Sequence, residues 1–300
     1  MLDNLQIMIA APPITVDLVV NGILIGAIFA LASYGMALVW GVIKIINISQ
    51  GEYVILGGYV AIVLAEHGYH PLLGVPLAAL LLAVLGWLIY RLVIFRIVDR
   101  DMFTSLLATY GIAILLQQLM NTAFGGGVRI ADAGLGTRFL FDGMVAIAEI
   151  KIIGFVLAAL LAAILVWFLK RSRTGQAIRA TAQNPRAARV VGIDTDRVYA
   201  ATFALNAAIC GAAGALVAMA YTIHPYIGLA YTIRSFMIVV VAGLGNLVGV
   251  IAAGLGLGAA ENIAAFLLGT QYQLAFTFSL LVVVLVTRNL RRARRREALQ

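Results

Sequence analysis

Seven apolar segments dominate this sequence and limit the folds that are open to it. They cover residues 16–40, 52–65, 71–95, 104–124, 150–169, 198–222 and 235–287. An α-helix of about 20 apolar residues crosses the hydrocarbon core of a lipid bilayer. In that core only helices and closed barrels can pair all of their backbone polar groups. These segments therefore predict an all-α, polytopic integral membrane protein.

The charge content leaves little room for a soluble domain. Only 11% of the 300 residues are charged and 63% are hydrophobic, whereas soluble domains carry roughly 25% charged residues. We expect residues 1–300 to form a single transmembrane domain of about 8–10 helices. The last apolar segment, 235–287, is too long for one crossing, and its glycines predict that some helices are short or broken.

Three basic stretches predict the orientation of the chain. Sixteen of its 21 Lys and Arg residues lie in 91–100, 170–197 and 288–296, each directly after an apolar run. Basic loops stay in the cytoplasm, so the N-terminus is expected outside and the C-terminus inside. The loops expected outside are 66–71, 125–149 and 224–231. The region 234–287 must then cross an odd number of times; a single crossing would leave most of its residues unused, so we expect either three short crossings or one crossing plus a re-entrant piece. The basic tail 288–300 suits lipid headgroups better than nucleic acid.

The basic loop at about 170–198 contains a short helix with clear end signals. Asn184 can cap its start, Pro185 suits its first turn and Gly192 can end it. A helix this short is not stable alone in water, so either the rest of the loop or a docked partner must hold it; the alanines favour docking over an ordinary basic loop. The residues assigned to this docking element are Thr181, Gln183, Asn184, Pro185, Arg186, Ala187, Ala188, Arg189, Val191 and Gly192. The chain has no GxxxxGK[ST] phosphate loop with which to bind ATP itself.

Pairs of small residues four apart suggest close helix packing. This spacing lets two helix backbones approach each other in a membrane. The glycines assigned to packing are Gly22, Gly26, Gly245, Gly249, Gly254 and Gly258. The late glycines superficially resemble a dinucleotide-binding fingerprint, but no βαβ pattern surrounds them.

Polar side chains at membrane depth are candidates for a substrate path. Ionisable and polar groups inside a bilayer are costly, which makes a functional role the first hypothesis. The candidates are Asn47, Gln50, Glu52, Tyr110, Gln117 and Asn206. Glu261 and Asn262 form a second polar site at membrane depth. Glu52 and Glu261 both lie near predicted span ends, so structural capping is at least as good an explanation for them as substrate contact. The chain shows no catalytic constellation and no metal-binding cluster, and we expect no cofactor.

Several stretches resemble a known family, the LivH-type permeases of bacterial branched-chain amino acid ABC importers. The similar stretches are 26–61, with Asn47, Gly51 and Glu52 in an N-x-x-x-G-E element, 106–119 with its glutamine pair, 175–216 and 239–262. Together they span nearly the whole chain, and 175–216 is the most specific. The basic C-terminal end departs from the tail that is common in the family.

The resemblance implies that residues 1–300 are a transmembrane permease domain in the bacterial inner membrane, which translocates branched-chain amino acids. It also implies three kinds of protein partner: a second homologous permease subunit, two cytoplasmic ATPase subunits that bind the ATP, and a periplasmic substrate-binding protein. Membrane lipid is the partner expected from the apolar segments themselves. In the family, the cytoplasmic loop docks on the ATPase. The alternatives are an ABC permease for urea or short amides, and a self-powered secondary transporter. Nothing in the sequence supports a membrane enzyme.

Overall fold

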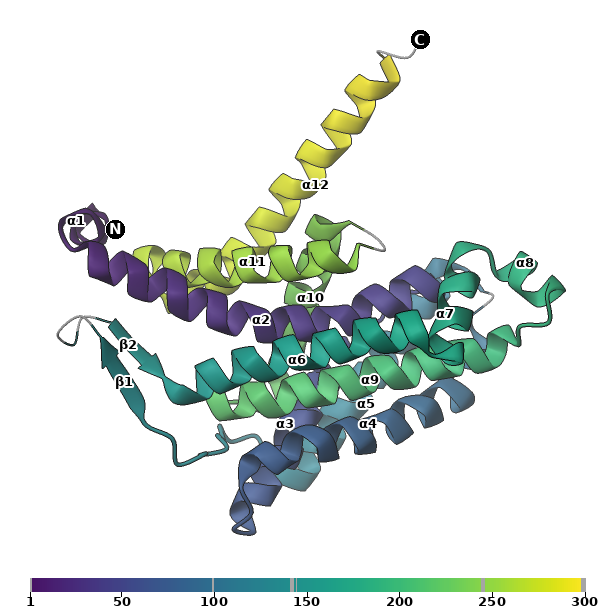
Figure 1. The fold of residues 1–300 in the computed structure, drawn as a ribbon, viewed down its shortest axis with the longest axis horizontal. Coiled ribbons are helices and arrows are strands. Elements are labelled where there is room, and N and C mark those ends of the chain that lie inside the picture. Colours follow the sequence, from purple (N-terminus) through teal and green to yellow (C-terminus); the bar gives the residue numbers. More distant parts are fainter. Residues whose placement is uncertain (1, 99, 141–142, 144, 244–245, 298–300) are drawn as a thin grey trace.

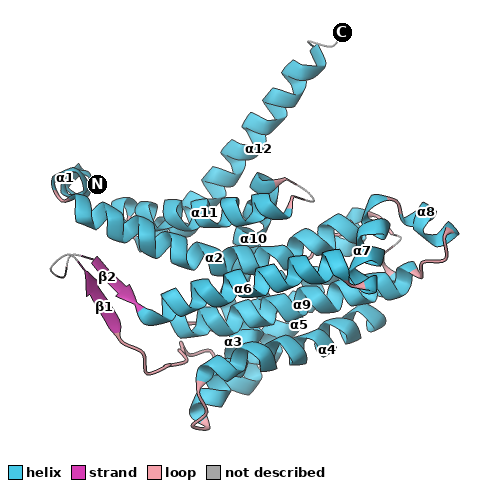
Figure 2. Cartoon of the chain, in the orientation of Figure 1, coloured by secondary structure: helices cyan, strands magenta, loops and turns pink. Residues whose placement is uncertain are grey.

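The chain folds almost entirely into helices, as Figures 1 and 2 show. The computed structural model describes residues 2–98, 100–140, 143, 145–243 and 246–297. The α-helices are α1 (Leu2–Ala10), α2 (Pro12–Val42), α3 (Gln50–Glu66), α4 (Gly74–Leu92), α5 (Met102–Phe124), α6 (Glu149–Arg171), α7 (Arg173–Gln183), α8 (Pro185–Val190), α9 (Thr195–Ala220), α10 (Gly228–Ala242), α11 (Leu247–Leu268) and α12 (Gln273–Glu297). The shorter elements are the 3-10 turns η1 (Pro71–Leu73), η2 (Ile94–Arg96), η3 (Pro225–Ile227) and η4 (Thr270–Tyr272), and the strands β1 (Thr137–Leu140) and β2 (Val145–Ala148).

The lengths of the helices confirm a polytopic membrane protein. Within the described residues, eight helices are long and apolar enough to cross a bilayer. Helix α3, with 17 residues, is a ninth apolar helix that is slightly shorter. The region 234–287 holds parts of three separate helices, α10, α11 and α12, which agrees with the first of the two alternatives, three short crossings.

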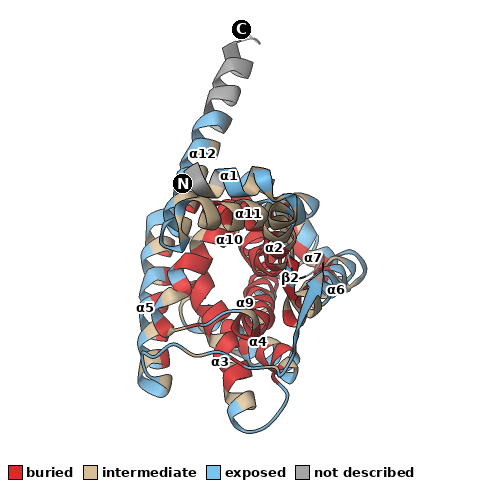
Figure 3. Cartoon of the chain, turned by 90° about the vertical axis from the view of Figure 1, so that its left-hand side faces the viewer, coloured by how far each residue is buried: buried red, intermediate tan, exposed pale blue. Residues whose placement is uncertain are grey.

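Helix α9 lies at the centre of the bundle and packs against α2, α3 and α4. Figure 3 shows its buried residues in the middle of the molecule, whereas α5 and α12 lie at the edge. Two glycines of α9 allow this packing: a Cβ at Gly214 would lie 1.8 Å from the Val54 carbonyl oxygen of α3, and one at Gly211 would lie 2.8 Å from the Ala78 oxygen of α4. Any side chain at these positions would force the helices apart.

Helices α2 and α11 pack against each other through glycines from both. A Cβ at Gly258 would lie 2.2 Å from the Gly22 oxygen, and one at Gly26 would lie 2.6 Å from the Gly254 oxygen. Four of the six glycines assigned to packing therefore lie at this contact. Gly249 differs, because the atoms nearest to its Cβ position belong to the Asn246 cap and to Ala242. The sixth, Gly245, lies outside the described residues.

The two ends of the bundle carry different structures. The β1–β2 hairpin lies at one end and the α7–α8 loop at the other, while α12 projects away from the bundle (Figure 1). At the hairpin end, Arg129 forms an ion pair with Glu66 at 2.8 Å and a backbone bridge with Ile223. These contacts link the three loops that are expected on the same side of the membrane, 66–71, 125–149 and 224–231. Glu66 and Arg129 lie within the first two loops, and Ile223 directly precedes the third.

Candidate functional site

An irregular segment joins α2 to α3 inside the bundle. The backbone leaves the helix after Val42, and Lys44 has a positive φ of 63°. Backbone polar groups at such a break need partners when water is excluded. The Thr109 hydroxyl of α5 accepts from the Ile48 N–H at 3.2 Å, and the Thr232 hydroxyl of α10 donates to the Ile48 carbonyl at 2.9 Å. Two other helices therefore hold this break in place.

Three buried amide side chains, Asn47, Gln50 and Asn206, form what we call the amide cluster. Each is at most 1% exposed. The Gln50 Nε2 donates to the Ala32 carbonyl and contacts the Cys210 Sγ, both at 2.9 Å. Gln50 and Asn206 meet at Gly35 of α2, where a Cβ would lie 2.3 Å from Asn206 Oδ1 and 3.2 Å from Gln50 Nε2. The cluster thus depends on a glycine in the C-terminal third of α2.

Several buried polar atoms around the start of α3 and on α9 have no hydrogen-bond partner in the described part of the chain. They are Asn47 Nδ2, Gln50 Oε1, Glu52 Oε2 and Asn206 Nδ2. Leaving a buried polar group unpaired costs about 1–3 kcal/mol, so such groups call for an explanation such as a bound water or a ligand. Donors and acceptors are both present, which suits a small polar guest.

The remaining path candidates lie elsewhere. Tyr110 lies on α5 and is 49% exposed, and Gln117 of the same helix is half-buried. Glu52 is buried next to Gly228, where a Cβ would lie 2.3 Å from Glu52 Oε1. The structure therefore brings Gln50 and Asn206 together, with Asn47 and Glu52 close to Gln50 along the chain, and it leaves the two α5 residues apart.

A buried ion pair that sequence reasoning did not assign to the path joins Arg234 of α10 to Glu261 of α11. The Arg234 Nε lies 3.1 Å from Glu261 Oε1 and 2.9 Å from Oε2. The Glu261 carboxylate also accepts from Thr277 of α12 and from Gln273 Nε2 at 3.3 Å. One signal was visible: Glu261 is the sole formal charge between Arg234 and Arg288.

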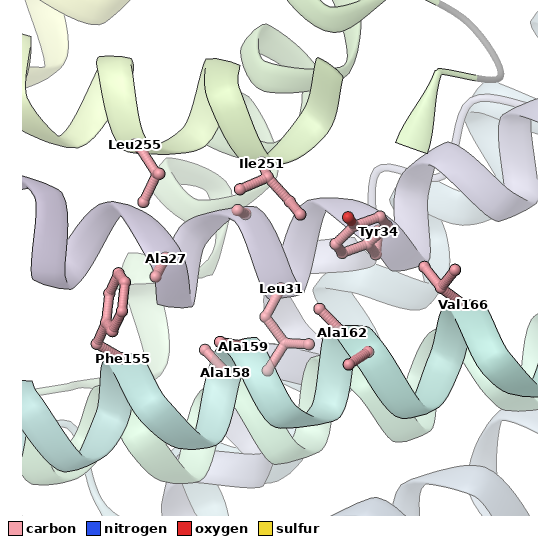
Figure 4. A pocket seen from close by; sticks show the side chains of 12 residues that line it. Ala27, Leu31, Tyr34, Phe155, Ala158, Ala159, Ala162, Val166, Ile251 and Leu255 are labelled. Atoms are coloured by element: carbon pink, nitrogen blue, oxygen red, sulfur yellow. The ribbon is translucent and has the colours of Figure 1, made fainter. Parts of the chain in front are cut away.

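Two cavities beside α2 differ in chemistry. The first is lined almost wholly by apolar side chains, and Figure 4 shows Ala27 and Leu31 of α2, Ala158 and Ala162 of α6, and Ile251 of α11 around it. The second has a volume of about 220 Å³ and is lined by both Arg234 and Glu261; we call it the ion-pair pocket. Of the two, only the ion-pair pocket presents charged groups to a guest.

The α7–α8 loop has the local structure that its end signals predict. Asn184 Oδ1 accepts from the Arg186 and Ala187 N–H groups at 3.0 and 3.1 Å, and Gly192 has a φ of 86°. Helix α8, Pro185–Val190, is thereby confirmed as a short capped helix. Its role in docking stays a prediction.

The exposed face of α8 is not the one expected. Ala188 is only 3% exposed, whereas Val190 and Val191 are 87% and 75% exposed. Ala187 is exposed, so the two alanines do not form one outer surface. The valines at the end of the helix take their place.

The other assigned residues of the loop are divided between its surface and its interior. Gln183 and Arg186 are exposed, whereas Thr181 is fully buried. Arg189 donates from Nε to the Thr195 hydroxyl at 2.7 Å, which ties α8 to the start of α9. Arg186 is thus the more available of the two arginines in α8.

The chain is similar to known transport permeases along most of its length. Residues 18–285 match a family model described as the permease component of branched-chain amino acid transport systems. The high-affinity branched-chain amino acid transport permease LivH of Salmonella typhimurium is 30% identical over 286 residues, which cover 89% of this chain and 91% of that protein. The corresponding permease BraD of Pseudomonas aeruginosa is 31% identical over 284 residues, covering 90% and 92%. A fructose import permease, FrcC of Rhizobium meliloti, is 28% identical over 141 residues, covering 44% and 39%. No solved structure matches the chain.

Proposed function

The chain belongs to the permease-component family of branched-chain amino acid transport systems, and from that premise we propose that it forms part of the transmembrane path of an ATP-driven importer of leucine, isoleucine and valine. The observation that carries the proposal is about 30% identity along nearly the full length of permeases named for this transport. The relationship supports amino acids over urea or short amides. The relatives are transport components, so an enzymatic activity is not proposed.

The proposed partners are a second homologous permease subunit, two cytoplasmic ATPases and a periplasmic substrate-binding protein. The sequence has no phosphate loop of its own, so ATP binding and hydrolysis belong to the ATPases. The orientation proposed is N-terminus outside and C-terminus inside, because the basic stretches then face the cytoplasm. The α7–α8 loop lies at the opposite end from the β1–β2 hairpin, as this orientation requires.

The coupling element proposed is α8. Its exposed Val190 and Val191 provide a small apolar contact, and Arg186 beside them can pair with a carboxylate on an ATPase. The substrate path proposed passes the amide cluster and Glu52, because their unpaired donors and acceptors lie inside the bundle. Tyr110 and Gln117 remain candidates on α5.

The test is uptake by the complete complex in proteoliposomes. The chain, its permease partner and both ATPases are reconstituted, and the binding protein is added outside. We expect ATP-dependent uptake of labelled leucine, isoleucine and valine, and none of urea. Uptake of urea in place of leucine would contradict the substrate, and leucine uptake without ATP would instead support a secondary transporter.

A further inference from the structure

The ion-pair pocket lies just outward of the amide cluster. It is lined by Phe29 of α2, whereas Gln50 of the cluster binds Ala32 of the same helix. Three residues of α-helix span about 4.5 Å, so the two regions lie less than one turn apart along α2. The pocket is also lined by Thr222, whose neighbour Ile223 pairs with Arg129 at the hairpin end. A solute entering from that end would reach the pocket before the cluster.

Arg234 is held in this pocket by Glu261 and by two aromatic rings, and several of its N–H groups remain unpaired among the described residues. The residue is 8% exposed, and its Cζ lies 5.1 Å from the ring centre of Phe29 and 5.5 Å from that of Tyr231. In the described part of the chain, its recorded hydrogen bonds all come from Nε and go to Glu261. A guanidinium has five N–H groups in a planar fork. Those on Nη1 and Nη2 are therefore available to a guest, and they suit the two oxygens of a carboxylate.

The rest of the pocket favours a guest that is neutral overall. Glu261 balances the charge of Arg234, and it already accepts from Arg234, Thr277 and Gln273. An anion alone would add an unbalanced charge at a buried site, which is costly. Asn262 also lines the pocket; its Nδ2 donates to the Leu18 carbonyl at 2.7 Å, and no hydrogen bond to its Oδ1 is recorded among the described residues. That oxygen can accept from an ammonium group.

We propose that the ion-pair pocket is an entry site that recognises the zwitterionic head of an α-amino acid. The Arg234 Nη groups donate to its α-carboxylate and the Asn262 Oδ1 accepts from its α-ammonium. The apolar side chain of the amino acid lies against Phe29 and Ile25, which line the same pocket. This inference rests on the proposed function and adds to it a site that selects amino acids over amines and amides. The same arginine chemistry would also suit a lipid phosphate, so the test separates the two.

The test uses a cysteine introduced at position 222. Cys210 is the chain's sole cysteine and is fully buried, so label measured on this chain, after its separation from the other subunits, reports on Thr222→Cys, which lines the pocket and is exposed. The complete complex is labelled without the binding protein in phosphatidylcholine nanodiscs. We expect saturating leucine to slow labelling about tenfold, 4-methylpentanoate to slow it less, and isopentylamine and leucinamide to leave it unchanged. This ligand series requires no change at Arg234.

A matched pair of arginine variants then locates the carboxylate site. Arg234→Lys keeps the charge but loses the planar fork, so leucine should no longer protect the Thr222→Cys complex. Arg129→Lys changes an arginine that also pairs with a carboxylate, in an exposed ion pair at the same end, and protection should persist.

Three results would overturn the inference: no protection by leucine, equal protection by isopentylamine, or protection that survives Arg234→Lys. A fourth would be labelling slowed by phosphatidylglycerol in the nanodisc regardless of leucine, which would show a lipid site. In each case a complex that still imports leucine leaves the proposed function standing. Loss of leucine import by the unmodified complex would instead refute the proposed function.

Discussion

The amide cluster and the ion-pair pocket are both polar regions inside an apolar bundle, yet among the described residues neutral amide groups of the cluster lack partners, whereas the Glu261 carboxylate of the pocket is paired with three side chains. The cluster is uncharged and keeps Gln50 Oε1 and Asn206 Nδ2 without partners. In the pocket, the Glu261 carboxylate binds side chains from two other helices, α10 and α12. Neutral unpaired groups can exchange water or a guest at little cost, whereas a buried charge must stay paired. The comparison suggests that the cluster serves passage and that Glu261 holds the helices together.

The largest loss of stability is expected when Glu261 is changed. Glu261→Gln leaves Arg234 buried without its counter-charge, which typically costs about 3–5 kcal/mol. Thermal unfolding of the purified complex should show a large decrease in the melting temperature. Glu66→Gln breaks the exposed pair with Arg129 and serves as control, with an expected cost of about 0–1 kcal/mol. Equal effects of the two variants would show that Glu261 is not an anchor.

A smaller loss is expected when the packing that positions the cluster is changed. Gly214→Ala places a methyl group 1.8 Å from the Val54 oxygen, so α3 must shift away from α9. Overpacking of this kind costs about 1–3 kcal/mol, and transport should fall because Gln50 begins the displaced helix. Gly111→Ala in α5, where no neighbouring helix or side chain lies within 4 Å of the Cβ position, should leave both the stability and the transport rate unchanged. Normal transport by Gly214→Ala would show that substrate passage does not depend on the position of α3.

Changing the cluster itself should lower transport more than stability. Asn206→Leu replaces an amide whose Nδ2 is unpaired by an apolar side chain of similar size. Among the described residues, the hydrogen bond lost is a weak one that the Asn206 Oδ1 accepts from the Cys210 thiol at 3.7 Å, so the free energy of unfolding should change by less than about 1 kcal/mol. Leucine uptake should fall at least about tenfold, by analogy with the loss of one buried polar contact of about 1.4 kcal/mol. Lowered stability with normal uptake would reverse the assignment and make the cluster structural.

The smallest effect on stability is expected at α8, which touches neither region. Val190 is 87% exposed, so Val190→Glu should not alter the melting temperature. It should abolish substrate-stimulated ATP hydrolysis by placing a carboxylate in the proposed apolar contact with the ATPase. Val128→Glu, at a 65% exposed position on the hairpin side, is the matched control. Stimulated hydrolysis at the normal rate in Val190→Glu would exclude this surface from coupling. Ala188 is unsuitable for the test, because a charge at a buried position would disturb the loop itself.

Local signals predicted the parts of the site that depend on neighbouring residues. Asn184, Pro185 and Gly192 predicted α8, because capping groups act on the backbone within a few residues of themselves. Contacts between distant residues were not visible in the same way. Arg234 and Glu261 are isolated charges in the sequence, and nothing local shows that they share a pocket.

What the sequence by itself determined is the class of the protein, because the length and apolarity of the segments leave no other fold for them. The tertiary structure alone decided which side of each helix faces inward. Thr109 is fully buried and binds the α2–α3 break, whereas its neighbour Tyr110 is 49% exposed. In a soluble protein a polar stripe would mark the outer face of such a helix. In a bilayer the outer face is apolar as well, so the sequence pattern no longer separates the inner face of a helix from its outer face. Packing against the other helices then decides which side of each helix faces the interior of the bundle.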